Sequence, residues 1–202
     1  MIAGHARIGC VVMAAGASRR MGLPKQLLRF RGRPLLLRAV QAAQHSAATL
    51  SAVVLGASRD RVARAIAGTG IETVDNADWR QGMSSSVRAA VAWARMRDCD
   101  GLLLAVGDQP HLTSEHLDAL IAASAGATRI AASAYDDVLG VPALFPWEMF
   151  QRLESLSGDA GARALLQHLA FRVVSVPWPE GAADIDRPSD LAGAEAFIAA
   201  RE

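Results

Sequence analysis

The 202-residue sequence has few of the residues that mark several classes of protein. It holds only two cysteines, Cys10 and Cys99, which is too few for a disulfide framework. Both stand in apolar runs, so we expect small buried hydrophobes of a reduced compartment. No spacing resembles a set of metal-binding cysteines or histidines. The formal net charge is only +1, which gives no reason to expect a partner among nucleic acids or membrane surfaces.

Long hydrophobic runs are also missing. No segment approaches the roughly 18 to 20 uninterrupted apolar residues of a membrane-spanning helix. The first 17 residues have some features of a signal peptide, but they continue without a break into a strand and a loop, so we expect a cytoplasmic protein. With 51% hydrophobic residues the chain can bury a sizeable core, and its length fits one domain over residues 1–202.

Apolar runs alternate with helical patterns along nearly the whole chain, which predicts an α/β fold. We expect a single Rossmann-like, doubly wound, mostly parallel sheet, with a small antiparallel excursion around residues 130–150. In such sheets ligands bind at the carboxyl ends of the strands. The expected strands are 8–14, 52–55, 72–74, 102–106, 130–134, 142–145 and 172–176. The expected helices begin at Pro34, near Ser58, after 84–86 and after Thr113, and then cover 146–156, 160–169 and 188–200.

Small and basic residues follow the first strand in "VVMAAGASRRMGLPKQLL", residues 11–28. Gly16, Ala17 and Ser18 have little or no side chain, so their amides can approach an anion closely. Arg20 and Lys25 would add positive charge, which predicts a cradle for a polyphosphate. The alternative is a surface turn with solvated arginines. The spacing matches neither the P-loop nor the G-x-G-x-x-G pattern of dinucleotide-binding proteins.

Carboxylates follow two of the expected strands. Asp108 ends the apolar run "LLLAV" and could hold Mg²⁺, which prefers oxygen ligands and bridges to substrate phosphates. The alternative is an aspartate that caps its own loop. Asp184 and Asp186 follow the last strand two positions apart, so in an extended segment they share a face and one of them could complete the metal site. The alternative is that Pro188 and Asp190 merely start the final helix, a role that can hold at the same time as the metal site.

Two further motifs stand at expected helix starts. In "GMSSSV" (82–87) the hydroxyls could cap the helix or bind a ligand, although three in a row exceed what a cap requires. In "GDAGAR" (158–163) Asp159 and Arg163 flank small residues, an arrangement that suits an anionic ligand or a capped helix with a solvated arginine.

Residues 11–28 closely resemble the L-A-A-G-x-S-x-R-M-G-x-x-K-x-L-L signature of the MobA-like nucleotidyltransferases. Within that family they look most like the molybdenum-cofactor cytidylyltransferase branch, because the guanylyltransferases usually carry Ala-Gly-Gly where this chain has Ala14-Ala15-Gly16. The resemblance continues in the family's order over almost the whole chain. The further motifs are "GMSSSVRAAV" (82–91), "GDQP" (107–110), "GVPALF" (140–145), "GDAGAR" (158–163) and "DIDRPSDL" (184–191).

This resemblance implies the fold of nucleotide-diphospho-sugar transferases (GT-A-like) and a Mg²⁺-dependent transfer of CMP. The CMP would pass from CTP to the terminal phosphate of molybdenum-bound molybdopterin. A molybdenum hydroxylase or its insertion chaperone is the protein partner that the resemblance implies. The residues expected by role are Arg20, Lys25 and Asp108 for catalysis; Ala14, Ala15, Gly16, Ala17, Ser18, Arg20, Lys25, Ser86 and Gly107 for the nucleotide; Asp108 and Asp186, with Asp184 as a neighbour, for the metal; and Gly140, Asp159, Arg163 and Asp184 for the second substrate.

The sequence departs from the family pattern at three positions. Arg187 and Ser189 replace Thr and Glu, and Val141 stands where many relatives carry a polar residue, often His. Two alternatives therefore stay open. One is a nucleotidyltransferase of another specificity, using GTP or a sugar or polyol phosphate acceptor. The other is a non-catalytic carrier that hands the cofactor to an apo-enzyme, although such a carrier would not need a metal site made of two carboxylates.

Overall fold

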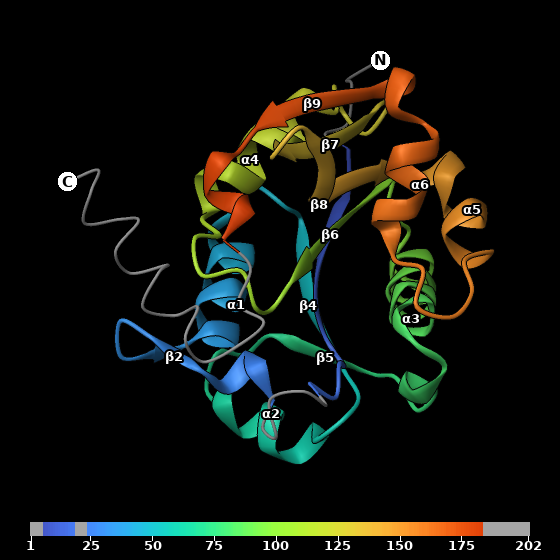
Figure 1. The fold of residues 1–202 in the computed structure, drawn as a ribbon. Coiled ribbons are helices and arrows are strands. Elements are labelled where there is room, and N and C mark those ends of the chain that lie inside the picture. Colours follow the sequence, from blue (N-terminus) through green and yellow to red (C-terminus); the bar gives the residue numbers. More distant parts are fainter. Residues whose placement is uncertain (1–5, 19–23, 184–202) are drawn as a thin grey trace.

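The computed structural model describes residues 6–18 and 24–183. A seven-stranded sheet runs through its centre in the order β5-β4-β1-β6-β8-β7-β9 (Figure 1). All its neighbours pair in parallel except β8, which is antiparallel to both β6 and β7. The predicted doubly wound, mostly parallel sheet with an antiparallel excursion is confirmed. Its strands are β1 (Ile8–Ala14), β4 (Leu50–Leu55), β5 (Glu72–Asp75), β6 (Gly101–Val106), β7 (Ile130–Tyr135), β8 (Val138–Pro146) and β9 (Val173–Pro177).

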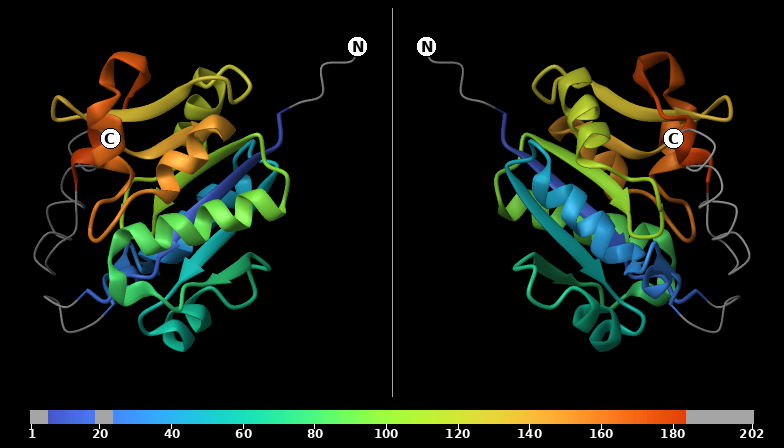
Figure 2. Two further views of the ribbon diagram at one scale, coloured as in Figure 1. Left: turned by 90° about the vertical axis from the view of Figure 1, so that its right-hand side faces the viewer. Right: turned by 90° about the vertical axis from the view of Figure 1, so that its left-hand side faces the viewer.

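Helices cover both faces of the sheet, as the two side views in Figure 2 show. Side chains alternate along β1, because successive residues of a strand point to opposite faces. Cys10 and Val12 belong to the core on one side, and Val11 and Met13 to the core on the other. The first core is closed by α1 (Leu35–His45), α2 (Arg59–Ala65) and α4 (Ser114–Ala123), the second by α3 (Met83–Met96), α5 (Phe150–Glu154) and α6 (Ala162–His168).

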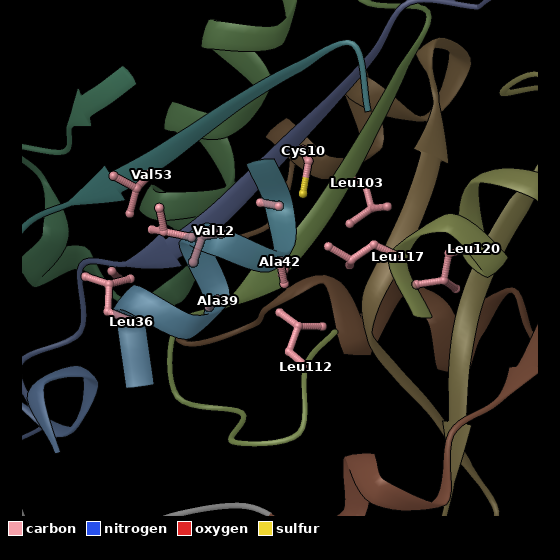
Figure 3. Packing of buried hydrophobic residues seen from close by; sticks show 14 of the residues in the cluster. Cys10, Val12, Leu36, Ala39, Ala42, Val53, Leu103, Leu112, Leu117 and Leu120 are labelled. Carbon is pink, nitrogen blue, oxygen red and sulfur yellow. The ribbon is translucent and has the colours of Figure 1, made fainter. Parts of the chain in front are cut away.

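Both cores are packed tightly around β1. Figure 3 shows Leu36 of α1 and Leu117 of α4 directed at the sheet residues Val12 and Leu103. On the other face Trp93 is fully buried against Gly9, where an added Cβ would lie 2.7 Å from the indole Cζ3. The predicted burial of both cysteines is confirmed. Burial raises the pKa of Cys10 to about 12 and also raises that of Cys99, so both thiols stay protonated near neutral pH.

Some local predictions were wrong. A two-stranded hairpin of β2 (Arg29–Phe30) and β3 (Arg33–Pro34) precedes α1, and the sequence analysis missed it because each strand has only two residues. The start of α3 is at Met83, ahead of the predicted one, and Gly82 caps the helix without a side-chain hydrogen bond. The serines therefore lie inside the first turn and do not cap it. The predicted helix over 188–200 lies outside the described residues.

Short 3-10 helices complete the fold, namely η1 (Lys25–Leu27), η2 (Trp79–Gln81), η3 (Trp147–Met149), η4 (Ala170–Arg172) and η5 (Pro179–Ala182). Across residues 6–18 and 24–183, no helix has the length and apolar character needed to cross a membrane.

Candidate functional site

Two adjacent cavities lie at the carboxyl ends of the central strands, where ligands bind in doubly wound sheets. The first has a volume of about 440 Å³ and the second about 420 Å³. Met83, the first residue of α3, lines both of them. The first cavity is lined by Met13, Ala15, Gly16, Ala17, Ser18, Trp79, Arg80, Gly82, Met83, Ser86 and Asp159. The second is lined by Lys25, Met83, Val106, Asp108, Gln109, Tyr135, Asp136, Val138, Val141, Arg163, Gly181 and Ala182.

The loop after β1 lines the first cavity with Ala15, Gly16, Ala17 and Ser18. Hydrogen bonds fix the carbonyl groups of this loop. Gln26 Nε2 donates to Ala14 O (2.8 Å) and to Gly16 O (3.1 Å). The carbonyl of Ala15, between these two, accepts the N–H of Ala57. Within the described part of the chain, no acceptor faces the N–H groups of residues 16–18. Small residues with N–H groups of this kind suit an anion, and the cradle for a polyphosphate stays a prediction.

Ser18 joins this loop to the second cavity. Its backbone has a φ of 48°, a left-handed conformation that turns the chain, and its hydroxyl accepts the N–H of Lys25 at 2.9 Å. The same turn brings the Lys25 side chain to Asp108, whose Oδ2 lies 2.5 Å from the ammonium nitrogen. Only 13% of the Asp108 side chain is exposed, so this ion pair is well shielded from solvent.

Gln109 lies beside this ion pair in the second cavity. Its Nε2 donates to the carbonyl of Val141 at 3.0 Å, and the Tyr135 hydroxyl donates to the same oxygen at 3.4 Å. Gln109 Oε1 is buried and has no hydrogen-bond partner among the described residues. A buried acceptor of this kind favours a ligand that brings a donor or a cation.

A buried network supports the wall of the second cavity. The Ser133 hydroxyl donates to the carbonyl of Pro142 at 2.7 Å, and His116 Nε2 lies 2.8 Å from Ser133 Oγ. The serine proton is already used, so His116 must donate through Nε2, which fixes its neutral tautomer. His116 also stacks on Trp178 with ring centroids 4.5 Å apart. Burial lowers the pKa of His116 to about 4, and Glu180 partly offsets this effect.

The GDAGAR motif (158–163) is attached to the start of α3. The N–H of Ser84 donates to Gly158 O at 3.1 Å, and Arg88 donates to Leu156 O at 3.0 Å. Gly82 has a φ of 96°, and a Cβ there would lie 2.5 Å from Gly158 O, so only glycine permits this contact. The attachment places Asp159 in the first cavity and Arg163 in the second.

The structure brings most of the predicted site residues to the two cavities. Ala15, Gly16, Ala17, Ser18 and Ser86 line the first, together with Asp159, which the sequence analysis expected at the second substrate. Lys25, Asp108 and Arg163 line the second.

The other predicted site residues lie elsewhere. Ala14 is buried at the end of β1. Gly107 donates its N–H to Met13 O, and an added Cβ would lie 2.9 Å from Leu36 Cδ1. Gly140 packs under the Tyr135 ring. Three predicted site residues lie outside the described residues: Arg20, Asp184 and Asp186.

Sequence reasoning missed three residues that organise the site: Gln26, Asn76 and Arg88. Asn76 is buried and contacts two of the three serines in the first turn of α3. In the sequence, Gln26, Asn76 and Arg88 stand out only as polar residues close to a motif. Many exposed residues have the same property, so the sequence could not single these three out. Within the described ranges no three acidic, histidine or cysteine side chains form a metal cluster. The second cavity is lined by two carboxylates, those of Asp108 and Asp136.

Known proteins resemble this chain over most of its length. A family model described as "MobA-like NTP transferase domain" matches residues 10–173. Nicotine blue oxidoreductase from Paenarthrobacter nicotinovorans is 33% identical over 172 residues, which cover 81% of this chain and 83% of that protein. Molybdenum cofactor guanylyltransferase from Rhodobacter capsulatus is 28% identical over 195 residues, which cover 94% of this chain and 95% of that protein.

Solved structures share the fold. The crystal structure of an Rv0371c homologue from Mycobacterium sp. strain JC1 is 31% identical and has a TM-score of 0.79, covering 95% of this chain and 98% of its own. Rv0371c of Mycobacterium tuberculosis H37Rv in complex with manganese is 29% identical and has a TM-score of 0.76, covering 94% of this chain and 98% of its own.

Proposed function

The chain belongs to the MobA-like NTP transferase domain family, and from this premise we propose that it transfers CMP from CTP to the terminal phosphate of molybdenum-bound molybdopterin. The observation that carries the proposal is the pair of cavities that meet at Met83. One is lined by the small residues of the loop after β1 and the other by a lysine, an arginine and a strand-end aspartate. This division suits a nucleotide in the first cavity and an anionic acceptor in the second.

In the proposed reaction a phosphate oxygen of the acceptor attacks the α-phosphorus of CTP. A new P–O bond forms, the bond between the α-phosphorus and the bridging oxygen breaks, and pyrophosphate leaves with the bonding electrons. The acceptor phosphate is already largely ionised near neutral pH, since its second pKa is about 6, so no general base is needed. The protein therefore has to align two phosphates and offset their charge.

Each of these tasks has residues suited to it. The amides of residues 16–18 would bind the phosphates of CTP, and Lys25, with Arg20 outside the described residues, would stabilise the departing pyrophosphate. Arg163 would bind the phosphate of the acceptor. Met83 lies between the two groups of residues, at the boundary where the reacting phosphates would meet.

A divalent cation fits the chemistry of the second cavity. Asp108 offers a shielded carboxylate whose present partner is the Lys25 ammonium, and the buried Gln109 Oε1 has no hydrogen-bond partner among the described residues. Asp108 would hold Mg²⁺ together with Asp186, as in the sequence-based prediction. Bound there, the ion would polarise the α-phosphate and offset its charge. The manganese complex of Rv0371c supports a divalent cation for this fold.

The polar groups of the first cavity suit cytosine. This base has an amino donor beside ring acceptors, and the cavity offers the Ser86 hydroxyl and the Asp159 carboxylate. A second candidate is GTP, because guanine also combines N–H donors with an acceptor. The guanylyltransferase relative and the Asp159 carboxylate, which could accept two N–H groups, favour that candidate.

The experiment that tests the proposal is pyrophosphate release with Mg²⁺ and molybdenum-loaded molybdopterin, with CTP, GTP and ATP offered separately. We expect release with CTP. Release with GTP alone would show that the nucleotide substrate is GTP and would leave the proposed nucleotidyl transfer unchanged. No release with any of them, from protein that binds CTP, would reject the acceptor and favour the carrier alternative. Because one relative is named an oxidoreductase, NADH and NADPH oxidation is followed in parallel, and oxidation without pyrophosphate release would contradict the proposal.

A further inference from the structure

The hydrogen-bonding direction of Asn76 is fixed by the backbone. Its Oδ1 accepts the N–H of Asp78 at 3.0 Å, and a backbone N–H can only donate. Nδ2 must therefore point the other way, where it donates to Ser85 Oγ at 2.9 Å and to Ser86 Oγ at 3.1 Å. Asn76 is buried and is not among the described residues that line the first cavity. It acts on this cavity only through the serines.

The two serines then differ in what they can still do. The Ser85 hydroxyl accepts from Asn76 and donates to Gly82 O at 2.8 Å, so its proton is used inside the protein. The Ser86 hydroxyl also accepts from Asn76, and among the described residues no acceptor takes its proton. Ser86 is only 5% exposed and lines the first cavity. A ligand in that cavity can accept this proton.

We infer that Asn76 is a positioning residue that makes Ser86 a hydrogen-bond donor toward an acceptor atom of the nucleotide base. The inference rests on the proposed function, because it requires a nucleotide in the first cavity. A base that places an acceptor before Ser86 satisfies the buried hydroxyl, whereas a base that places an N–H there leaves the proton without a partner. Leaving a buried donor unpaired lowers affinity about 10- to 100-fold.

The test reverses the polarity of Asn76. Asn76→Asp has nearly the same shape and keeps the acceptor for Asp78, but it offers an acceptor to Ser86 in place of a donor. The Ser86 proton then turns away from the cavity. We expect the dissociation constant for CTP, measured by calorimetry, to rise about tenfold or more. Asn76→Ala removes the donor without supplying an acceptor, so we expect a smaller loss of CTP affinity than with Asn76→Asp.

Three controls separate this role from a structural one. Ser85→Ala alters the same network but leaves Ser86 bonded to Asn76, so CTP affinity should stay within about twofold of the wild type. Inorganic tripolyphosphate carries no base, and its affinity should be the same in Asn76→Ala, Ser85→Ala, Ser86→Ala and the wild type. In Asn76→Asp it measures the part of the loss that comes from the added negative charge, and the loss of CTP affinity should exceed it. Ser86→Ala should weaken CTP binding as Asn76→Asp does, and the double variant N76D/S86A should be no weaker than Ser86→Ala alone.

Several outcomes would overturn the inference. They are an unchanged CTP affinity in Asn76→Asp, a larger loss in Asn76→Ala than in Asn76→Asp, fully additive losses in the double variant, or a parallel loss of tripolyphosphate binding. If the wild type prefers another nucleotide, the same cycle is measured with that nucleotide. Coupling between Asn76 and Ser86 without any pyrophosphate release would keep the inference and reject the proposed reaction.

Discussion

Lys25 and Asp108 form an ion pair across the second cavity, with 2.5 Å between Nζ and Oδ2. Lys25 comes from the segment after β1 and Asp108 from the end of β6, so the contact exists only because these two strands pair in the sheet. In the proposed reaction the two groups separate when substrates and cation arrive, the ammonium turning to the pyrophosphate and the carboxylate to the cation. The pair would thus hold both residues in place before binding.

Removing either member should slow the reaction more than it weakens CTP binding. We expect Lys25→Met to lower the rate of pyrophosphate release about 100-fold, because one group that stabilises the developing charge is lost. Asp108→Asn should lower it by a similar factor. Arg59→Met, which breaks the ion pair of Arg59 with Asp75 on the surface, is the control and should leave the rate unchanged. Wild-type rates in Lys25→Met would remove this lysine from the proposed mechanism.

Gln26 should be needed for the shape of the loop after β1 (residues 15–18). In Gln26→Ala the carbonyls of Ala14 and Gly16 lose their donor, which should lower the free energy of unfolding by about 1–3 kcal/mol. The loop should also bind tripolyphosphate more weakly, as calorimetry would show. Gln44→Ala removes an exposed hydrogen bond to Thr69 and should change neither quantity much. Unaltered tripolyphosphate binding in Gln26→Ala would show that the loop keeps its shape alone.

Two glycines near β1 should respond differently to the same substitution. Gly9→Ala brings a Cβ to 2.7 Å from the Trp93 ring, and overpacking of this kind costs about 1–3 kcal/mol of the free energy of unfolding. Gly16→Ala meets no atom within 4 Å, so stability should be nearly unchanged. Urea unfolding of both variants measures the difference. Equal stabilities would mean that Trp93 moves aside at little cost.

His116 should make stability depend on pH. Its pKa is lowered from 6.5 to about 4 in the folded protein, mainly by burial, so the unfolded chain binds a proton more readily. This contribution to stability is fully present above about pH 6.5 and is lost as the pH falls toward 4. It amounts to about 3 kcal/mol.

Urea unfolding at pH 7 and pH 5 measures this effect. The variant His116→Gln should lose less stability between the two values than the wild type does. His45→Gln, at the exposed end of α1, should lose as much as the wild type. A steep loss that persists in His116→Gln would assign the pH dependence to another group.

Much of the fold could be predicted from the sequence because the patterns that specify strands and helices are local. The unbroken apolar run Ile8–Ala14 predicted β1 with its observed bounds, and α4 begins directly after Thr113 as predicted. The predicted start of α3 was less accurate, because the residue that caps this helix is Gly82, which has no side chain that could mark the start in the sequence. The loop at 16–18 and the strand-end Asp108 were placed at the correct edge, since the carboxyl ends of parallel strands lie together.

The sequence by itself determined the family, the order along the chain of the strands of the central sheet and of helices α1 to α6, and which motifs follow a strand. Only the tertiary structure decided how the motifs meet. It placed Asp159 and Arg163 in different cavities. It also brought Gln26 to the carbonyl of Ala14 and Asn76 to the hydroxyl of Ser86. These contacts join segments that are distant in the sequence. Which group donates and which accepts depends on the hydrogen bonds that a buried side chain can form once the sheet has packed. The spacing of residues along the chain carries no such information.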